Sequence, residues 1–413
     1  MASALSGGAY VGLGPLSAAV HPTLILQDHG SLEAVPLYET IDWPQARGSE
    51  LSTIFDPGQS FIRVDLLGLA AGLSNENLWW GPARTNPILF SNTAPGFPHV
   101  FFGTGRPLDL WVGHLEAEVL VGELEESAYF NDDPTDDRRH LSAFGVAFHP
   151  RGLEGIALGF AGVQITGADE GEGLLRTLLG VAEGSNPAGN ALGSVFARWR
   201  LPESAFALYA ELGRDDLWDG LPDLLGEPEH SLAYVVGLEK GLDLDGGWIH
   251  GFAELVHLQA SNSFRTGRPM PGFYTHSSVR QGHTQQGQLL GAPVGPGSNA
   301  ILAGADLFAG WGQVGITLER TTHANDAYLR RVARRGLAQE DRRDVEHAIE
   351  LRHTVFIGPV DLRWSFGLGY RPERGLVELL SDEEVSVPDL NVALRLGLRW
   401  YPGAERVAPP AWP

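Results

Sequence analysis

Two acidic residues lie at the spacing that hydrolysis of a glycosidic bond requires. Glu116 and Glu118 belong to the segment WVGHLEAEVLVGE, residues 111–123, and alternate residues of a strand face one side about 7 Å apart. This separation is near that of the paired carboxylates of glycosidases. Two inward acids also make an ordinary polar wall, so the pair has both interpretations.

No other pattern in the chain indicates a catalytic centre. The sequence has no G-x-S-x-G elbow, no H-E-x-x-H, no P-loop and no dinucleotide-binding glycine fingerprint. It has no cysteine, which excludes disulfides and thiolate chemistry. The fourteen histidines are scattered, and pairs such as His276 with His283 or His21 with His29 are weak evidence for a metal site. We therefore expect that the protein has no catalytic residue, metal or cofactor and that it is not an enzyme.

The charge of the chain excludes a nucleic-acid partner. The formal net charge is −22, from 51 acidic and 29 basic residues, whereas binding to a phosphate backbone needs a basic surface. Lys240 is the only lysine, and the other basic residues are arginines. Guanidinium groups suit carboxylates and phosphates on a ligand, although a GC-rich genome would produce the same excess of arginine.

The segment NENLWWGPARTNPILFSNTAPGFPH, residues 75–99, combines adjacent tryptophans with several asparagines and prolines. Indole faces stack on the C–H surfaces of sugars, and amides exchange hydrogen bonds with hydroxyl groups. Prolines reduce the entropy lost when such a loop becomes ordered. The segment is therefore either a carbohydrate-binding loop or a plug whose tryptophans pack on a barrel wall.

Long strands with strict alternation position these residues. In VDLRWSFGLGY (360–370) and DLNVALRLGLRWY (389–401) every second residue is apolar, and polar or small residues lie between them. A soluble sandwich alternates too, but its strands average about 5 to 6 residues. Strands of about 10 to 13 residues suit a tilted crossing of a bilayer. The mixed acids, arginines, histidines and glycines of the second face suit a polar lumen, and Trp111, Trp248, Tyr370 and Trp400 suit interfacial girdles.

The connections between the expected strands alternate strictly between long and short. From residue 125 onward, long connections near 125–140, 167–192, 213–230, 261–298, 322–343 and 371–388 alternate with short turns near 150, 201–204, 240–246, 310 and 358–359. Transmembrane barrels have this pattern, with short periplasmic turns and long outer loops. We expect twelve strands from residue 108 onward and about six before it, namely FIRVDLL, LAAGLS, HVFFG, AYVGLG, VHPTLILQ and LEAVPLY.

The sequence thus predicts an all-β fold: a transmembrane antiparallel up-and-down β-barrel of about 18 strands, whose long extracellular loops fold partly into the lumen. It forms one domain over residues 1–413, with the weakest strand pattern in 1–58 and a proline-rich tail at 402–413. An even count places both termini in the periplasm, and no signal peptide is visible at the N-terminus.

Two segments resemble the Wzi-type capsule assembly proteins. GLSNENLWWGPARTNPILFSNTAPGFPHVFF is similar to that family's signature region, and residues 273–304, FYTHSSVRQGHTQQGQLLGAPVGPGSNAILAG, resemble its Y-x-H, Q-Q-G and G-x-P-x-G loop. The resemblance extends from about residue 59 onward. It implies an eighteen-stranded outer-membrane lectin that binds capsular or other surface polysaccharide without a catalytic step. Better-known members also carry an N-terminal periplasmic helical region, which this sequence does not show.

The resemblance implies a set of carbohydrate-binding residues in the two segments. We expect the tryptophans to stack on or shape the site, the amides to bind hydroxyl groups, and one arginine to bind a uronic-acid carboxylate. The candidates are Asn75, Glu76, Asn77, Trp79, Trp80, Arg84 (the arginine), Asn86, Asn92, His99, Tyr274, His276, Gln281, His283, Gln285 and Gln286.

Two function classes follow from the sequence. The first is a non-catalytic polysaccharide-binding barrel of the bacterial outer membrane, with the glycan and membrane lipid as partners, together with capsule export machinery. The second is a porin-like channel for sugars or small anions, whose loops only constrict the lumen.

Overall fold

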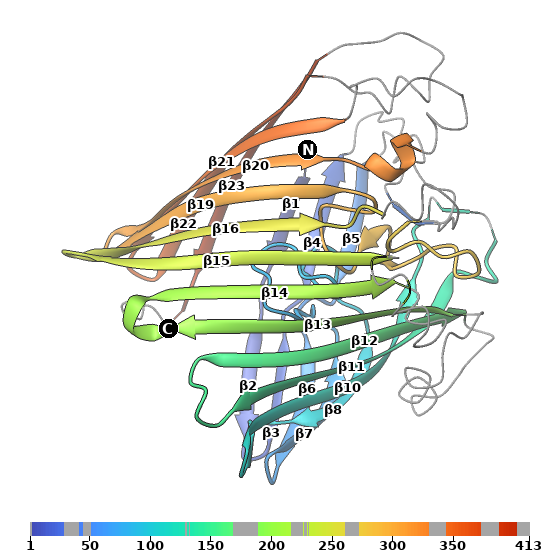
Figure 1. Cartoon of the computed structure of the whole chain (residues 1–413), viewed down its shortest axis with the longest axis horizontal. Helices are drawn as coiled ribbons and strands as arrows, with labels where there is room; N and C mark the ends of the chain where they lie inside the picture. The colour runs from blue at the N-terminus through green and yellow to red at the C-terminus, as the bar shows by residue number, and fades with distance from the viewer. Residues whose placement is uncertain are drawn as a thin grey trace.

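The computed structural model describes residues 2–28, 41–43, 51–128, 130–131, 133–167, 189–215, 226, 229, 231–260, 272–329, 344–372 and 388–402. They form an almost entirely antiparallel β structure that winds round a common interior (Figure 1). Helical structure among them comprises the 3-10 helix η2 (Pro202–Ser204), a turn at 325–329 and residue 226. The strands are β1 (Ala2–Ser6), β2 (Ala9–Leu13), β3 (Leu16–Val20), β4 (Thr23–Asp28), β5 (Leu51–Asp56), β6 (Phe61–Leu66), β7 (Leu69–Ser74), β8 (His99–Thr104), β9 (Leu108–Leu110), β10 (Gly113–Glu125), β11 (Arg138–Pro150), β12 (Ile156–Gly167), β13 (Asn190–Leu201), β14 (Phe206–Asp215), β15 (Leu232–Leu244), β16 (Gly247–His257), β17 (Thr284–Gln285), β18 (Gln288–Leu289), β19 (Asn299–Ala309), β20 (Gly312–Thr322), β21 (Val345–Ile357), β22 (Val360–Arg371) and β23 (Asp389–Trp400).

Eighteen of these strands belong to one barrel sheet, which confirms the predicted architecture. Neighbours in the sheet follow chain order, from β2 and β3 through β6, β7, β8 and β10 to β22 and β23. The short strands β17 and β18 form a separate hairpin, and β1, β4 and β5 form a three-stranded sheet. No helix in the described part of the chain is long and apolar enough to cross a membrane.

The apolar face of the sheet points outward, which distinguishes this barrel from a soluble sandwich. Leu394 and Leu396 on β23 are 65% and 79% exposed, and the outward side chains of β22 and of the other strands are exposed in the same way. A soluble protein does not leave so continuous an apolar band in contact with water. The band is the lipid-facing surface of a transmembrane barrel.

Short hairpin turns gather at one end of the strands (Figure 1), hereafter the turn end, and the long connections lie at the other, the loop end. The turns at 151–155, 202–205, 245–246, 310–311 and 358–359 confirm the predicted alternation of short and long connections. Positive φ angles at Gly246 (84°) and Gly358 (53°) explain why glycine occupies two of these turns.

Two details of the N-terminal region differ from the sequence prediction. Residues 104–107, from the last residue of β8 to the start of β9, lie opposite only residues 116–117 of β10. β9 therefore continues β8 after a bulge and does not form a new crossing. β1 and β2 run toward the turn end, as β23 does. The first described strand therefore begins at the loop end, and the expectation that the even count places both ends of the chain at the turn end is wrong for it.

The expected N-terminal strands are found only in part. AYVGLG and VHPTLILQ correspond to β2 and β4, whereas LEAVPLY lies outside the described residues. β3 (LSAAV) and β5 (LSTIFD) were not predicted, because short segments of small and hydroxyl residues carry a weak alternation signal.

Candidate functional site

The two segments singled out in the sequence fold into the barrel interior and form a plug, here residues 75–98 and 272–298. Ile88, Phe90 and Phe97 of the first segment and Phe273 and Tyr274 of the second are buried in one hydrophobic cluster. The inward residues of the loop half of the wall belong to the same cluster, among them Leu120, Leu124, Leu141, Ile165 and Leu192. Both segments therefore lie in the lumen.

Hydrogen bonds join the two segments into one unit. The Tyr274 hydroxyl donates to the Ile88 carbonyl oxygen (2.6 Å) and accepts from the Ala292 N–H (2.9 Å). His283 Nε2 lies 2.6 Å from the Leu89 carbonyl oxygen, and the imidazole stacks on the Tyr274 ring at 5.2 Å. Burial lowers the pKa of His283 to about 4 and raises the pKa of Tyr274. The imidazole is therefore neutral at physiological pH and donates from Nε2.

Acidic residues on the wall anchor the first segment. The Glu254 carboxylate accepts hydrogen bonds from the backbone N–H of Arg84 (2.8 Å) and from both the backbone N–H (3.0 Å) and Nδ2 (2.9 Å) of Asn86. The Tyr209 hydroxyl donates to the same carboxylate at 2.7 Å. The Arg84 guanidinium forms an ion pair with Asp306 (3.0 Å) and lies 4.0 Å from the ring centroid of Phe252. Arg84 and Asn86 thus hold the plug in place.

The second segment is anchored at the loop end. Buried Arg139 on β11 donates to the carbonyl oxygens of Gly282 and Thr284, both at 3.0 Å. Gln285 Oε1 accepts the Glu125 N–H (2.8 Å), and Gln286 Nε2 donates to the Glu125 carboxylate (2.9 Å). These contacts fix the β17–β18 hairpin against the ends of β10 and β11.

Gln281 contacts a group of acids in the connection after β10. Its Nε2 donates to Glu126 Oε2 at 2.7 Å. Glu126, Asp136 and Asp137 bring carboxylate oxygens within 4.8 Å of one another, and burial raises the pKa of Glu126. Exposed acids gather in this way without a metal ion, so the expectation of no metal site stays a prediction.

Trp79 and Trp80 line a cavity of about 320 Å³ in the turn half of the lumen. Trp79 is 40% exposed, and its Nε1 donates to the Ala83 carbonyl oxygen (3.1 Å). Trp80 packs edge-on against Phe90 (5.1 Å between centroids), and a Cβ at Gly145 would lie 3.5 Å from its indole. The absence of a side chain at Gly145 therefore lets the indole lie on the wall. The rest of the lining comes from Gly81, Thr104, Glu116, Ala117, Glu118, Val146, Ala147, Ala161 and Phe196.

Most of the other predicted residues in and beside the first segment take part in hydrogen bonds with nearby residues. Asn75 Nδ2 donates to the Gly58 carbonyl oxygen (3.2 Å), and Asn77 Nδ2 to that of Ala94 (2.5 Å). Glu76 accepts from the Ser74 hydroxyl (3.0 Å), and His99 Nδ1 lies 2.8 Å from the Phe97 carbonyl oxygen. Asn92 is exposed.

His276 has a comparable local role in the second segment. Its Nδ1 accepts the N–H groups of Ser278 (3.2 Å) and Val279 (3.1 Å). Among the fifteen predicted residues, only the two tryptophans line the cavity described above. The carbohydrate-binding roles of the whole set stay predictions.

Sequence reasoning missed the residues of the wall that complete these sites. Glu211, Glu254 and Asp306 hold the plug, and Phe196 lines the tryptophan cavity. An acid at an inward position of a long strand is the signal that could have identified the three acids. Alternation does identify the inward side of Glu116 and Glu118, but not their position beside the tryptophans.

The family model described as "Capsule assembly protein Wzi" matches residues 43–385. The chain belongs to the Wzi capsule assembly family. The match includes both plug segments and every strand of the barrel from β6 to β22. No curated protein matches this Wzi family member.

Three solved structures show similarity to this Wzi family member. The Escherichia coli structure described as Wzi, an outer-membrane protein involved in group 1 capsule assembly and a carbohydrate-binding β-barrel, is 14% identical. The match covers 96% of this chain and 76% of that one with a TM-score of 0.64, which shows a shared fold. Pseudomonas aeruginosa OccK7 and OccK2, the latter in complex with glucuronate, match at 10% and 11% identity. Each covers 96% of this chain, and 90% and 91% of the two structures, with TM-scores of 0.45 and 0.47.

The family, the fold and the outward apolar band all indicate the same cellular location. This Wzi family member is a β-barrel of the bacterial outer membrane. Its turn end accordingly faces the periplasm.

Proposed function

We propose that this barrel binds capsular or other cell-surface polysaccharide in the cavity lined by Trp79 and Trp80, and that it helps to assemble or anchor that polysaccharide without a catalytic step. The observation that carries the proposal is the position of these two indoles, which come from the plug and line a polar cavity in the lumen. The carbohydrate binding of the E. coli Wzi structure supports it.

The chemistry of the cavity suits a sugar. Indole and phenyl faces from Trp79 and Phe196 offer apolar surface to the C–H side of a pyranose ring. Glu116, Glu118 and Thr104 offer acceptors and a hydroxyl to its OH groups. Because this part of the lining carries two acids and no basic residue, a neutral sugar fits it better than a uronic acid. The expected role of Arg84 toward a uronic acid is not supported, since its guanidinium pairs with Asp306.

The arrangement of the two acids favours binding over hydrolysis. Both Glu116 and Glu118 belong to β10 and face the cavity from one wall. A glycosidase places its two carboxylates on either side of the scissile bond. The interaction of Glu116 with His149, 3.5 Å away, is that of a polar lumen wall.

A porin-like channel is the less supported alternative. Steady conduction needs a continuous aqueous path, and the loop half of the lumen is filled by the buried plug. Capsule export machinery and membrane lipid as partners also stay proposals.

A binding assay with purified capsular polysaccharide and the folded protein in detergent tests the proposed function. Trp79→Ala should weaken binding roughly tenfold, because an aromatic contact and its buried area are lost together. Trp111→Ala is the matched control, since this indole is 88% exposed at a turn. A folded Trp79→Ala, Trp80→Ala double variant, checked by heat-modifiable migration on gels, that binds as the unchanged protein does would refute the proposal.

A further inference from the structure

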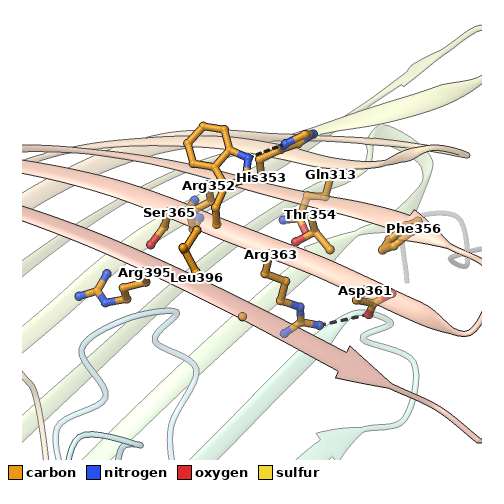
Figure 2. A pocket seen from close by; sticks show the side chains of 12 residues that line it. Gln313, Arg352, His353, Thr354, Phe356, Asp361, Arg363, Ser365, Arg395 and Leu396 are labelled. Carbon is orange, nitrogen blue, oxygen red and sulfur yellow. Dashed lines mark hydrogen bonds and ion pairs between the residues drawn. The ribbon is translucent and has the colours of Figure 1, made fainter. Parts of the chain in front are cut away.

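A second cavity, of about 610 Å³, lies in the turn half of the lumen where β20 to β23 meet (Figure 2). It is separate from the tryptophan cavity and shares no lining residue with it. By the alternation of the strands, the inward residues of its lining are Gln313, Arg352, Thr354, Phe356, Asp361, Arg363, Ser365, Arg395 and Gly397. The other three lining residues, His353, Trp364 and Leu396, belong to the outward face. Three arginines and one acid line the cavity of a chain whose net charge is −22.

The three arginines are held to different degrees. Arg352 is fixed by ion pairs to Asp306 (3.1 Å) and Glu350 (3.0 Å) and by a hydrogen bond to Thr317 (2.7 Å). Its guanidinium is therefore part of the wall.

Arg363 and Arg395 are less constrained. Arg363 reaches toward Asp361 (Figure 2), but the 3.6 Å between Nη2 and Oδ2 exceeds hydrogen-bond distance, and its side chain is 46% exposed. Arg395 donates from Nη1 to Glu350 (2.9 Å), and its side chain is 70% exposed. A guanidinium has five N–H donors, so both groups present donors to the cavity that these contacts do not use.

The neutral residues of the cavity offer further groups that can contact a sugar. Thr354, Ser365 and Gln313 supply hydroxyl and amide groups, and Phe356 supplies an apolar face. Guanidinium forks bind carboxylates bidentately. We propose that the cavity binds an acidic sugar unit through its carboxylate, with Arg363 and Arg395 as the ligands of that group. The choice of a sugar rests on the proposed function, whereas the anionic character rests on the arginines alone.

The two cavities would then bind sugar units of different charge. The tryptophan cavity has carboxylates and aromatic faces, and the arginine cavity has guanidinium groups and hydroxyls. A polysaccharide with both neutral and acidic units could place one kind of unit in each.

Calorimetric titration of the folded full chain in detergent tests this proposal with three probes: glucuronic acid, glucose and inorganic phosphate. Glucuronic acid should bind saturably, and its affinity should fall with rising salt. At the arginine cavity glucose should bind at least about tenfold more weakly, because it lacks the charge-assisted hydrogen bonds. Any binding of glucose elsewhere should therefore be the same in the Arg363→Gln, Arg395→Gln double variant. Phosphate binding as tight as that of glucuronic acid would overturn the assignment to a sugar.

Two variants separate the arginine cavity from other sites. Arg363→Gln and Arg395→Gln should each lower the affinity for glucuronic acid about tenfold through loss of a charged donor pair. Arg151→Gln, at an exposed turn beside Asp109, should leave it unchanged. Equal affinity for glucuronic acid in the Arg363→Gln, Arg395→Gln double variant refutes the arginine cavity. Unchanged polysaccharide binding in the Trp79→Ala, Trp80→Ala double variant refutes only the proposed function.

Discussion

The hydroxyl of Tyr274 donates a 2.6 Å hydrogen bond to the carbonyl oxygen of Ile88, across 186 positions of sequence. The backbone of Tyr274 has a φ of +73°, a conformation that a bulky residue adopts only when its surroundings fix it. Its N–H donates to the Asp215 carboxylate (2.7 Å), which ties the same residue to the barrel wall. One residue thus connects both plug segments with β14.

Removing that hydroxyl should loosen the plug without unfolding the barrel. Tyr274→Phe leaves the Ile88 carbonyl and the Ala292 N–H without their buried partner, at a cost of roughly 1–3 kcal/mol. Hydrogen exchange followed by mass spectrometry should become faster in peptides covering residues 88–92 and 289–292. Tyr10→Phe, an exposed position on β2, is the control, and unchanged exchange in Tyr274→Phe would contradict the proposed connection.

Glu254 should be the most sensitive wall position. Its two oxygens accept from four plug donors and from the Tyr209 hydroxyl. Glu254→Gln removes the charge and sets an amide NH₂ against N–H donors, so we expect a loss of roughly 2–4 kcal/mol. Tm measured by differential scanning fluorimetry should fall, whereas Glu123→Gln, in an exposed pair with Arg138, should change it little. Equal Tm values would show that the wall acids do not anchor the plug.

Close packing along the seam between the two segments predicts a steric effect. A Cβ at Gly291 would fall within 3 Å of the Tyr274 ring and would meet the Ile88 carbonyl oxygen, whereas a Cβ at Gly251 would meet nothing nearer than 3.8 Å. Gly291→Ala should therefore destabilise the plug by roughly 1–3 kcal/mol, with an increase in planar-bilayer conductance. Gly251→Ala should conduct as the unchanged protein does. If Gly291→Ala conducts no more than Gly251→Ala, the seam does not close the lumen.

The protonation of His283 predicts that acid opens the plug. Burial lowers its pKa from 6.5 to about 4 in the folded plug. As pH falls from 6.5 toward 4, the released segment takes up a proton that the buried one does not, so the plug loses up to roughly 3 kcal/mol of stability. Nδ1 has no hydrogen-bond partner among the described residues, so a proton there would be buried without an acceptor.

Conductance as a function of pH measures this effect. It should rise below about pH 6 in the unchanged protein, because the proton uptake follows the ordinary pKa of imidazole. His283→Gln keeps an N–H donor toward the Leu89 carbonyl but cannot be protonated. Its conductance should therefore lack the rise below about pH 6. The same pH dependence in both proteins would exclude His283 as its cause.

The barrel could be predicted from the sequence because its lipid-facing residues obey a simple period. In β22 and β23 each second residue is apolar, and the register pairs Phe366 with Leu394 and Leu368 with Val392 on the outward face. The N-terminal strands were predicted less well, since β3 consists largely of small residues. The predicted direction of the first strand was also wrong, because six crossings were expected before residue 108. The described residues before β10 contribute five to the barrel, namely β2, β3, β6, β7 and β8 with its continuation β9.

The plug position was predictable, but the role of its residues was not. Loop parity and the mixture of Trp, Asn and Pro indicated a segment that enters the lumen. Arg84 was expected to face a sugar carboxylate, yet Asp306, a residue 222 positions away, binds it. Periodicity gives the side of a strand on which Asp306 lies, but which loop residue it meets depends on the shape of the closed barrel and on the path of the plug through it.

Both cavities lie in the turn half of the lumen, below a plug that occupies the loop half. Since the short turns of outer-membrane barrels face the periplasm, the two cavities, and with them the side chains of Trp79 and Arg363, lie on the periplasmic side of the buried part of the plug. The two sides of the molecule across the membrane therefore differ. A saccharide that arrives from within the envelope would encounter these side chains before the plug, and the exterior would be in contact with the loops instead.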